Sequence, residues 1–213
     1  MELVLIRHGV TAWNQQRRFQ GQIDTPLSDE GHQQAMLTAR HLSALSEEQP
    51  IQAIYASDLS RAFQTAQAIG AVAGCKPVAT PELRERHFGH FQTRTWAEIE
   101  DQWPEDAQRW RKRVPDWAPE GGESLLALSE RIEQVVQKLA PRHIGQQMVL
   151  VAHGGVMDVL YRLATGQSLQ APRTWSLGNA HINRLLWTPQ GLNLVGWGDD
   201  SHLHTPARDE TSA

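Results

Sequence analysis

The sequence lacks several features that mark particular classes of protein. One cysteine, Cys75, occurs among its 213 residues, which excludes an internal disulfide framework and is typical of a reducing compartment. The clearest apolar runs, at 3–6 and 148–152, are far too short to cross a bilayer. A secretory signal would carry positive charge where Glu2 stands. These absences predict a cytoplasmic protein that does not associate with membranes.

Strong charge of either sign is also missing. A formal net charge of −4 and a pI near 6.2 do not provide the basic surface of a nucleic-acid-binding protein, so we expect a small-molecule partner and no nucleic acid. The sequence has no glycine-rich nucleotide loop and no serine nucleophile elbow. Two histidine pairs, His87/His90 and His202/His204, have suggestive spacing but no third ligand, so no metal is predicted.

What the sequence contains is an alternation of apolar strands and amphipathic helices. Short apolar runs predict buried strands, and apolar residues at helical spacing predict the helices that cover them. Short connections between them indicate parallel strands. We therefore predict an α/β fold, a three-layer sandwich with a mainly parallel central sheet. Predicted strands lie at 3–6, 51–56, 148–152, 182–187 and 192–197, with a short one after 76, and predicted helices at 28–46, 57–74, 125–139 and 154–165.

Two of these helices have predicted caps. Ser28 precedes the first helix, and Ser57-Asp58 precedes the second.

The stretch from 93 to 117 has a different pattern. Tryptophan recurs there every seven residues, and Pro104 and Pro115 prevent one continuous helix. We predict two short helices in an insertion at about 88–118 that packs on the main sheet. The four tryptophans are expected to pack between insertion and sheet rather than to form a substrate lid; they are Trp96, Trp103, Trp110 and Trp117.

Histidines follow two of the predicted buried strands. Arg7-His8-Gly9 ends the first strand, and His153-Gly154-Gly155 ends the strand at 148–152. Arg61 falls in the first turn of the helix that leaves another strand. Because ligands bind outside the carboxyl ends of parallel strands, these groups predict a positively charged pocket suited to a phosphoryl dianion. The amides of Gly154-Gly155 at a helix start would add donors.

These blocks and several others resemble the histidine phosphatase superfamily, in its phosphoglycerate mutase-like branch. The matching blocks occur in order over nearly the whole chain, which makes the likeness specific. The resemblance implies one histidine phosphatase domain over 1–213, with the insertion at about 88–118. The blocks are 7–9 with Thr11 and Asn14, 19–28, 57–66, 83–89, 120–124 and 151–155.

The resemblance also implies roles. His8 would attack phosphorus through one ring nitrogen, with the other donating to a backbone carbonyl. Glu85 would protonate the leaving oxygen and then activate water. Arg7, Arg61 and His153 would bind the phosphoryl oxygens. The remaining substrate-binding positions are Thr11, Asn14, Gln20, Gly21 and Gly154. No cofactor and no metal are implied, because protein cations neutralise the phosphoryl charge.

The sequence leaves three functions open. We favour a phosphomonoesterase acting on a small phosphorylated metabolite, because Phe88 and Trp96 stand where the mutases have a tyrosine and a lysine. The alternative is a 2,3-bisphosphoglycerate-dependent phosphoglycerate mutase, supported by the mutase-like run at 110–112. Arg111 to Arg113 are expected to form a solvated helix face more readily than to contact substrate. The third possible function is a sensor that binds a phosphoryl ligand and catalyses no reaction. We disfavour it because binding alone needs no proton donor such as Glu85. A homodimer is compatible with the sequence.

Overall fold

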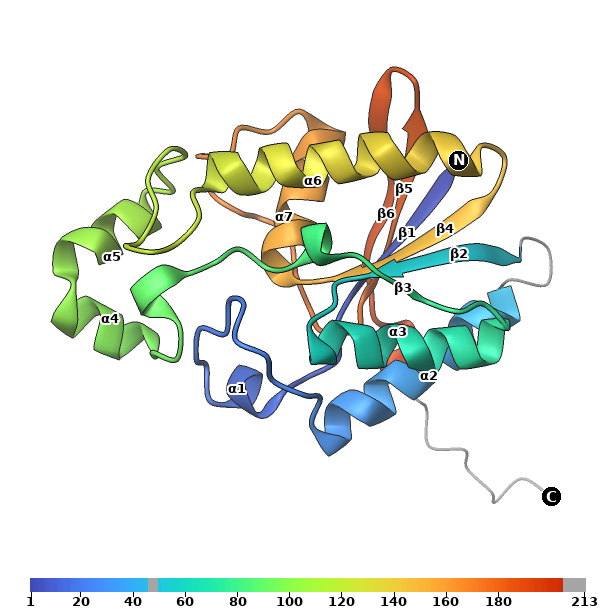
Figure 1. Ribbon diagram of the computed structural model, residues 1–213, viewed down its shortest axis with the longest axis horizontal. Helices are drawn as coiled ribbons and strands as arrows, with labels where there is room; N and C mark the ends of the chain where they lie inside the picture. The colour runs from blue at the N-terminus through green and yellow to red at the C-terminus, as the bar shows by residue number, and fades with distance from the viewer. Residues whose placement is uncertain (46–49, 205–213) are drawn as a thin grey trace.

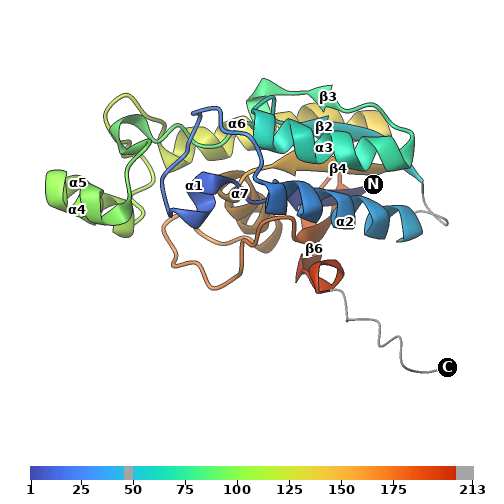
Figure 2. The same ribbon diagram turned by 90° about the horizontal axis from the view of Figure 1, so that it is seen from below.

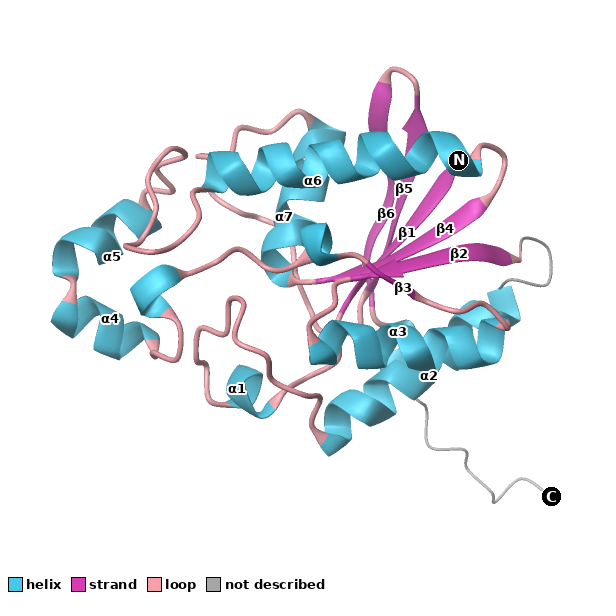
Figure 3. Ribbon diagram, viewed as in Figure 1, coloured by secondary structure: helices cyan, strands magenta, loops and turns pink. Residues whose placement is uncertain are grey.

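One sheet organises the part of the chain that the computed structural model describes, residues 1–45 and 50–204. Its six strands run in the order β3–β2–β4–β1–β5–β6 (Figures 1 and 3). Strands β1 to β4 pair in parallel, and β5 and β6 are antiparallel additions beside β1. The mainly parallel sheet is therefore confirmed. The strands are β1 (Glu2–Arg7), β2 (Ile51–Ala56), β3 (Val78–Ala79), β4 (Gln147–Ala152), β5 (Ile182–Thr188) and β6 (Gly191–Asp199).

Helices cover both faces of this sheet. Alternate residues of β1 point to opposite sides, so Leu3 and Leu5 join one buried cluster and Val4 and Ile6 join another. The first cluster is covered by α6 (Leu125–Leu139) and α7 (Gly154–Thr165), and the second by α2 (Asp29–Leu45) and α3 (Ser60–Ala73) (Figure 1). This arrangement confirms the α/β sandwich with three layers. Among the described helices, none combines the length and the apolar character needed to cross a membrane.

The starts of α2 and α3 differ in how they are capped. Ser28 Oγ accepts the N–H of Gly31 at 3.1 Å, which confirms the predicted cap of α2. The cap predicted at Ser57-Asp58 is wrong, because α3 begins at Ser60 and its N-cap position is Leu59. A carboxylate from a distant loop replaces it: Asp24 accepts the Ser60 N–H at 2.7 Å and its hydroxyl at 2.8 Å. The loop before α2 is thus fixed to the first turn of α3.

The insertion contains the two predicted short helices, α4 (Trp96–Gln102) and α5 (Pro104–Arg111). Pro104 is the first residue of α5, where a missing N–H costs little. Both helices lie at one end of the molecule, beyond the edge of the layers (Figure 2).

The expectation that the tryptophans pack on the sheet is wrong. All four surround a separate cluster centred on Phe91, Ile99 and Ala107. Phe19, from the loop after α1 (Ala12–Gln15), completes that cluster. Short 3-10 helices occur at Pro81–Leu83, Gly89–Phe91, Ala140–His143 and Ser201–Leu203.

Candidate active site

Strand register places the two histidines side by side. Arg7 at the end of β1 pairs with Ala152 at the end of β4, and a histidine directly follows each strand. The His8 N–H donates to the Ala152 carbonyl at 3.0 Å. The rings of His8 and His153 have centroids 5.2 Å apart, and both side chains are buried. The predicted convergence of the two strand ends is observed.

Hydrogen bonding determines which nitrogen of His8 carries its proton. Nδ1 lies 2.7 Å from the Gly9 carbonyl oxygen, which can only accept, so Nδ1 donates and Nε2 keeps its lone pair. The Asn179 side chain donates to the His8 carbonyl at 2.9 Å and holds the turn in place. Burial, then the charges of Arg61 and Arg7, lower the pKa of His8 well below its ordinary value. The ring is therefore neutral at physiological pH, as a nucleophile must be.

Two arginines, the buried Arg61 and the half-buried Arg7, stand close to this ring. Arg61, in the first turn of α3, donates to the carbonyls of Gly21 at 2.7 Å and Ile23 at 2.9 Å. Burial lowers the pKa of Arg61 to about 10, so it stays protonated at neutral pH. Arg7 donates to the Leu177 carbonyl, and burial likewise lowers its pKa.

Several nitrogens of this group have no partner within the described chain. They are Nε of Arg7, Nε of Arg61 and both ring nitrogens of His153. Burial, followed by the charge of Arg61, lowers the pKa of His153 well below its ordinary value, so this ring is neutral and offers one N–H. Buried polar nitrogens are rarely left unpaired in proteins. The set therefore suits a ligand group rich in acceptor oxygens.

Glu85 follows the 3-10 helix Pro81–Leu83, and its side chain reaches the same place at the start of α7. Its carboxylate accepts the Arg86 N–H at 2.8 Å and the Gly155 N–H at 3.0 Å. A Cβ on Gly155 would lie 2.3 Å from Glu85 Oε1, so only glycine permits this approach. A Cβ on Gly154 would lie 3.6 Å from Arg7 Nε. The carboxyl group and the Arg7 guanidinium thus border the same helix start.

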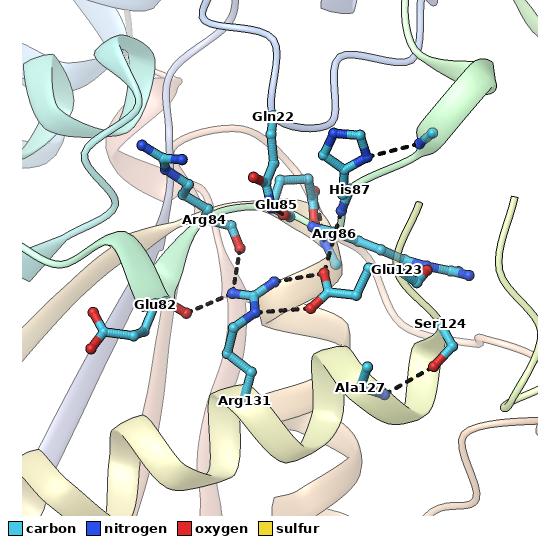
Figure 4. Close-up of polar contacts among 12 residues, drawn as sticks. Gln22, Glu82, Arg84, Glu85, Arg86, His87, Glu123, Ser124, Ala127 and Arg131 are labelled. Atoms are coloured by element: carbon cyan, nitrogen blue, oxygen red, sulfur yellow. Dashed lines mark hydrogen bonds and ion pairs between the residues drawn. The ribbon is translucent and has the colours of Figure 1, made fainter. Parts of the chain in front are cut away.

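The backbone that carries Glu85 is fixed by α6 and by the 19–27 loop (Figure 4). Arg131 of α6 donates to both carboxylate oxygens of Glu123, at 2.9 and 2.7 Å, and to the carbonyl of Arg84 at 3.0 Å. Gln22 donates to the Glu85 carbonyl at 3.0 Å. The carboxyl group is therefore positioned by contacts on both sides of its own peptide.

Four of these groups border a cavity of about 230 Å³, which we call the inner pocket, and His153 lies beside the His8 ring without lining it. The predicted residues Asn14, Gln20 and Gly21 line it together with Arg7, His8, Arg61 and Glu85. Thr11 does not line it. Its hydroxyl accepts the Asn14 N–H at 3.2 Å as the cap of α1 and donates to Gln20 Oε1 at 2.9 Å. Thr11 thus orients two pocket residues without reaching the pocket.

A larger cavity of about 720 Å³, the outer cavity, adjoins the inner pocket and shares Arg7 and Phe88 with it. The predicted residue Gly154 lines this outer cavity and not the inner pocket. The insertion forms the far side, and the loop between α7 and β5 closes the near side through Pro172, Arg173 and Leu177.

Two residues of the site were missed at the level of sequence. Arg86 is buried, donates to the Glu123 carbonyl at 2.7 Å and lies 4.5 Å from the ring centroid of Trp110. The block at 83–89 contains it, but only Glu85 carried an implied role. Asn179, which supports His8, has no distinguishing pattern around it in the sequence. Among the residues that the structure describes, no group of three or more His, Cys, Asp or Glu is arranged to hold a metal ion.

Comparison with known proteins agrees with this geometry. Phosphoglycerate mutase-like protein 4 of Arabidopsis thaliana is 39% identical over 205 residues, which cover 95% of this chain and 86% of that protein. The metal-independent phosphoserine phosphatase of the same plant is 37% identical over 204 residues, covering 95% and 83%. A solved mycobacterial glucosyl-3-phosphoglycerate phosphatase has a TM-score of 0.82 and 33% identity, covering 92% and 98%.

A family model matches residues 3–200. Because it spans nearly the whole chain, and because relatives above 30% identity align over most of their length, the predicted family is confirmed. The protein belongs to branch 1 of the histidine phosphatase superfamily.

Proposed function

We propose that the protein hydrolyses small phosphomonoesters and that Nε2 of His8 carries the phosphoryl group between two steps. The observation that supports this most directly is the state of His8: a neutral ring whose Nδ1 is held by the Gly9 carbonyl, facing unpaired donors of Arg7, Arg61 and His153. Relatives named as phosphatases support the same reaction class.

In the first step the Nε2 lone pair of His8 attacks phosphorus, and the bond from phosphorus to the alcohol oxygen breaks. Glu85 in its protonated form gives its proton to that oxygen. The guanidinium groups of Arg7 and Arg61, with the N–H of His153, stabilise the charge on the transferring oxygens. Nδ1 keeps its proton throughout, so the positive charge gained by the ring rests against the Gly9 carbonyl.

In the second step water attacks the phosphohistidine. Glu85, now a carboxylate, takes a proton from the water, and the bond from His8 to phosphorus breaks. The electron pair returns to Nε2, inorganic phosphate leaves, and both residues regain their starting state. The contacts of Glu85 with Arg86 and Gly155 hold it at one position for both proton transfers.

A mutase is the second candidate. The residues that line the outer cavity favour one of the two reactions over the other. Arg111 of the mutase-like run 110–112 lies in its wall, as does Arg113, whereas Lys112 does not line it. However, Arg111 pairs with Glu100, and Arg113 donates to Asp158 at 2.6 Å. The apolar rings of Phe88 and Trp96 line the same wall. We therefore favour transfer to water.

Trapping the intermediate tests the proposal. After rapid quenching with a ³²P-labelled phosphomonoester, we expect an acid-labile, base-stable label on the wild type and none on His8→Ala. The exposed residue His32 offers a matched control, and His32→Ala should label like the wild type. A label that persists in His8→Ala, with the fold intact by circular dichroism, would contradict the assignment.

Product analysis separates the remaining alternatives. With 3-phosphoglycerate we expect inorganic phosphate and glycerate; conversion to 2-phosphoglycerate without phosphate release would favour the mutase. Tight phosphate binding with no turnover of any phosphomonoester would favour a sensor. The cytoplasmic location, the homodimer and the absence of nucleic-acid and membrane partners stay predictions.

A further inference from the structure

The outer cavity carries more positive charge than a neutral leaving alcohol needs. Five arginines and one acidic residue, Asp158, are among the described residues that line it. Like charges gathered around a cavity repel one another and raise the local concentration of anions. The partners of each arginine show which of these charges is available to a ligand.

Three of the five guanidiniums are engaged by the protein. Arg86 donates to the backbone carbonyl of Glu123. Arg111 pairs with Glu100 and lies 5.0 Å from the ring centroid of Trp96. Arg113 donates to the Leu169 carbonyl at 2.8 Å and to Asp158. A fourth, Arg7, belongs to the inner pocket as well. These side chains are held by their own contacts.

Arg173 is different. It lies on the loop between α7 and β5, is exposed, and makes no side-chain hydrogen bond or ion pair within residues 1–45 and 50–204. It is also close to two other cations. The pKa values of Arg7 and Arg113 are lowered chiefly by burial, and the charge of Arg173 lowers both further. A free guanidinium that faces two like charges is a ready binding group for an anion.

The leaving alcohol of the proposed reaction must reach this cavity. Glu85 protonates the leaving oxygen, and Gly155, whose N–H it accepts, lines the outer cavity but not the inner pocket. The alcohol therefore extends from Glu85 into the space that Arg173 borders. That space, at about 720 Å³, is also large enough for a metabolite of several carbon atoms.

We propose that Arg173 binds a second anionic group of the substrate, a carboxylate or another phosphate on the alcohol side of the scissile bond. This inference rests on the proposed function, because it uses the direction in which the alcohol leaves. It makes Arg173 a specificity-determining residue that acts on the choice of alcohol. The preferred substrates are then small phosphorylated acids or bisphosphates, ahead of neutral alcohol phosphates.

Two matched substrate pairs test this. 3-Phosphoglycerate and glycerol 3-phosphate differ only in a carboxylate that replaces a hydroxymethyl group; propane-1,3-diol bisphosphate and propyl phosphate test a second phosphate. Phosphate release gives kcat/KM for each. In the wild type we expect the anionic member of at least one pair to be preferred, and the favoured pair identifies the second anion.

Arg173→Gln should lower that preference by about 10- to 100-fold, the range expected for one charge-assisted contact. Arg173→Lys, which keeps the charge, should restore part of it. The matched control is Arg142→Gln, an exposed arginine outside both cavities, which should keep the wild-type ratio.

The inference is overturned if the wild type shows no preference in either pair, or if Arg173→Gln lowers both members of a pair equally. Failure of the proposed function has a different result, namely no phosphate release from any of the four compounds and no label on His8. Because Arg173 is exposed, we expect its variants to fold, and urea unfolding checks this.

Discussion

The inner pocket and the outer cavity share Arg7 and Phe88 but are built in different ways. The inner pocket gathers the end of β1, the start of α3, Glu85 and the loop after α1, and hydrogen bonds to Arg61 and Glu85 hold that loop in place. The outer cavity is closed by the insertion and by the loop between α7 and β5. At the inner pocket the Nε atoms of Arg7 and Arg61 are unpaired and buried, whereas Arg173 of the outer cavity is exposed. The first arrangement suits one constant chemical group, and the second suits a variable one.

This difference predicts that substitutions in the inner pocket act on the reaction itself. Glu85→Gln keeps the size of the side chain but removes the proton donor, so kcat/KM for an alkyl phosphate should fall by about 10² to 10⁴. The loss should be much smaller with p-nitrophenyl phosphate, because nitrophenolate leaves without a proton. Steady-state kinetics with both substrates measure this, and Glu82→Gln, an exposed glutamate, is the control. An equal loss on both substrates would refute the acid role.

Among substitutions in the outer cavity, we expect Asp158→Asn to have the largest effect. It should change the free energy of unfolding rather than the reaction. Asp158 is 4% exposed and accepts from Arg113 at 2.6 Å and from the buried Arg162 at 3.0 Å. Asp158→Asn leaves both cations without their counter-charge, so the free energy of unfolding should fall by about 3 kcal/mol. Urea denaturation measures it. Asp101→Asn, at an exposed acid, should change stability by less than about 0.5 kcal/mol. A loss for Asp158→Asn no larger than that would show that the arginines are stabilised otherwise.

The two regions should also differ in their response to pH. The pKa values of His8 and His153 are lowered by burial, so below pH 6.5 the unfolded chain binds protons that the folded chain does not. Stability is therefore full above about pH 6.5 and decreases as the pH falls toward the folded-state pKa values. Each histidine contributes up to about 1.4 kcal/mol per pH unit within that window.

Urea unfolding between pH 7.5 and 5 measures that slope. The half-buried His181 and His202 also have pKa values lowered chiefly by desolvation, and they add to the slope. His153→Asn should flatten the slope by up to about 1.4 kcal/mol per pH unit, while the outer-cavity variant Arg173→Gln should not alter it. An unchanged slope in His153→Asn would show that other groups take up the protons on unfolding.

The features built from regular structure are the ones that could be predicted from the sequence. The layers follow from apolar spacing, and the nearness of His8 and His153 follows from two parallel strands ending in register. A repeat of tryptophan every seven residues indicates a shared environment but not what fills it. The cluster around Phe91 depends on Phe19, which is 72 positions earlier in the chain and lies in a loop without periodicity.

Side-chain contacts between distant segments also could not be predicted from the sequence. Local residues predict the cap of α3 at Ser57-Asp58, whereas Asp24, from a distant loop, supplies it. Asn179 and Arg173 lie in a loop whose course is fixed only by the finished fold. Family resemblance pointed to the groups that face phosphorus, and it contained no information on those that face the alcohol.

The bond from Asp24 to Ser60 has a consequence for how this protein can change over generations. One loop, 19–27, supplies both the cap of α3 and the carbonyls that hold Arg61. Lengthening or shortening that loop would displace a helix, a guanidinium and the chemistry together. The lining residues within 96–113 and 166–176 border the outer cavity and not the inner pocket. Gene variants that alter those two segments can explore new substrates while the reaction stays the same.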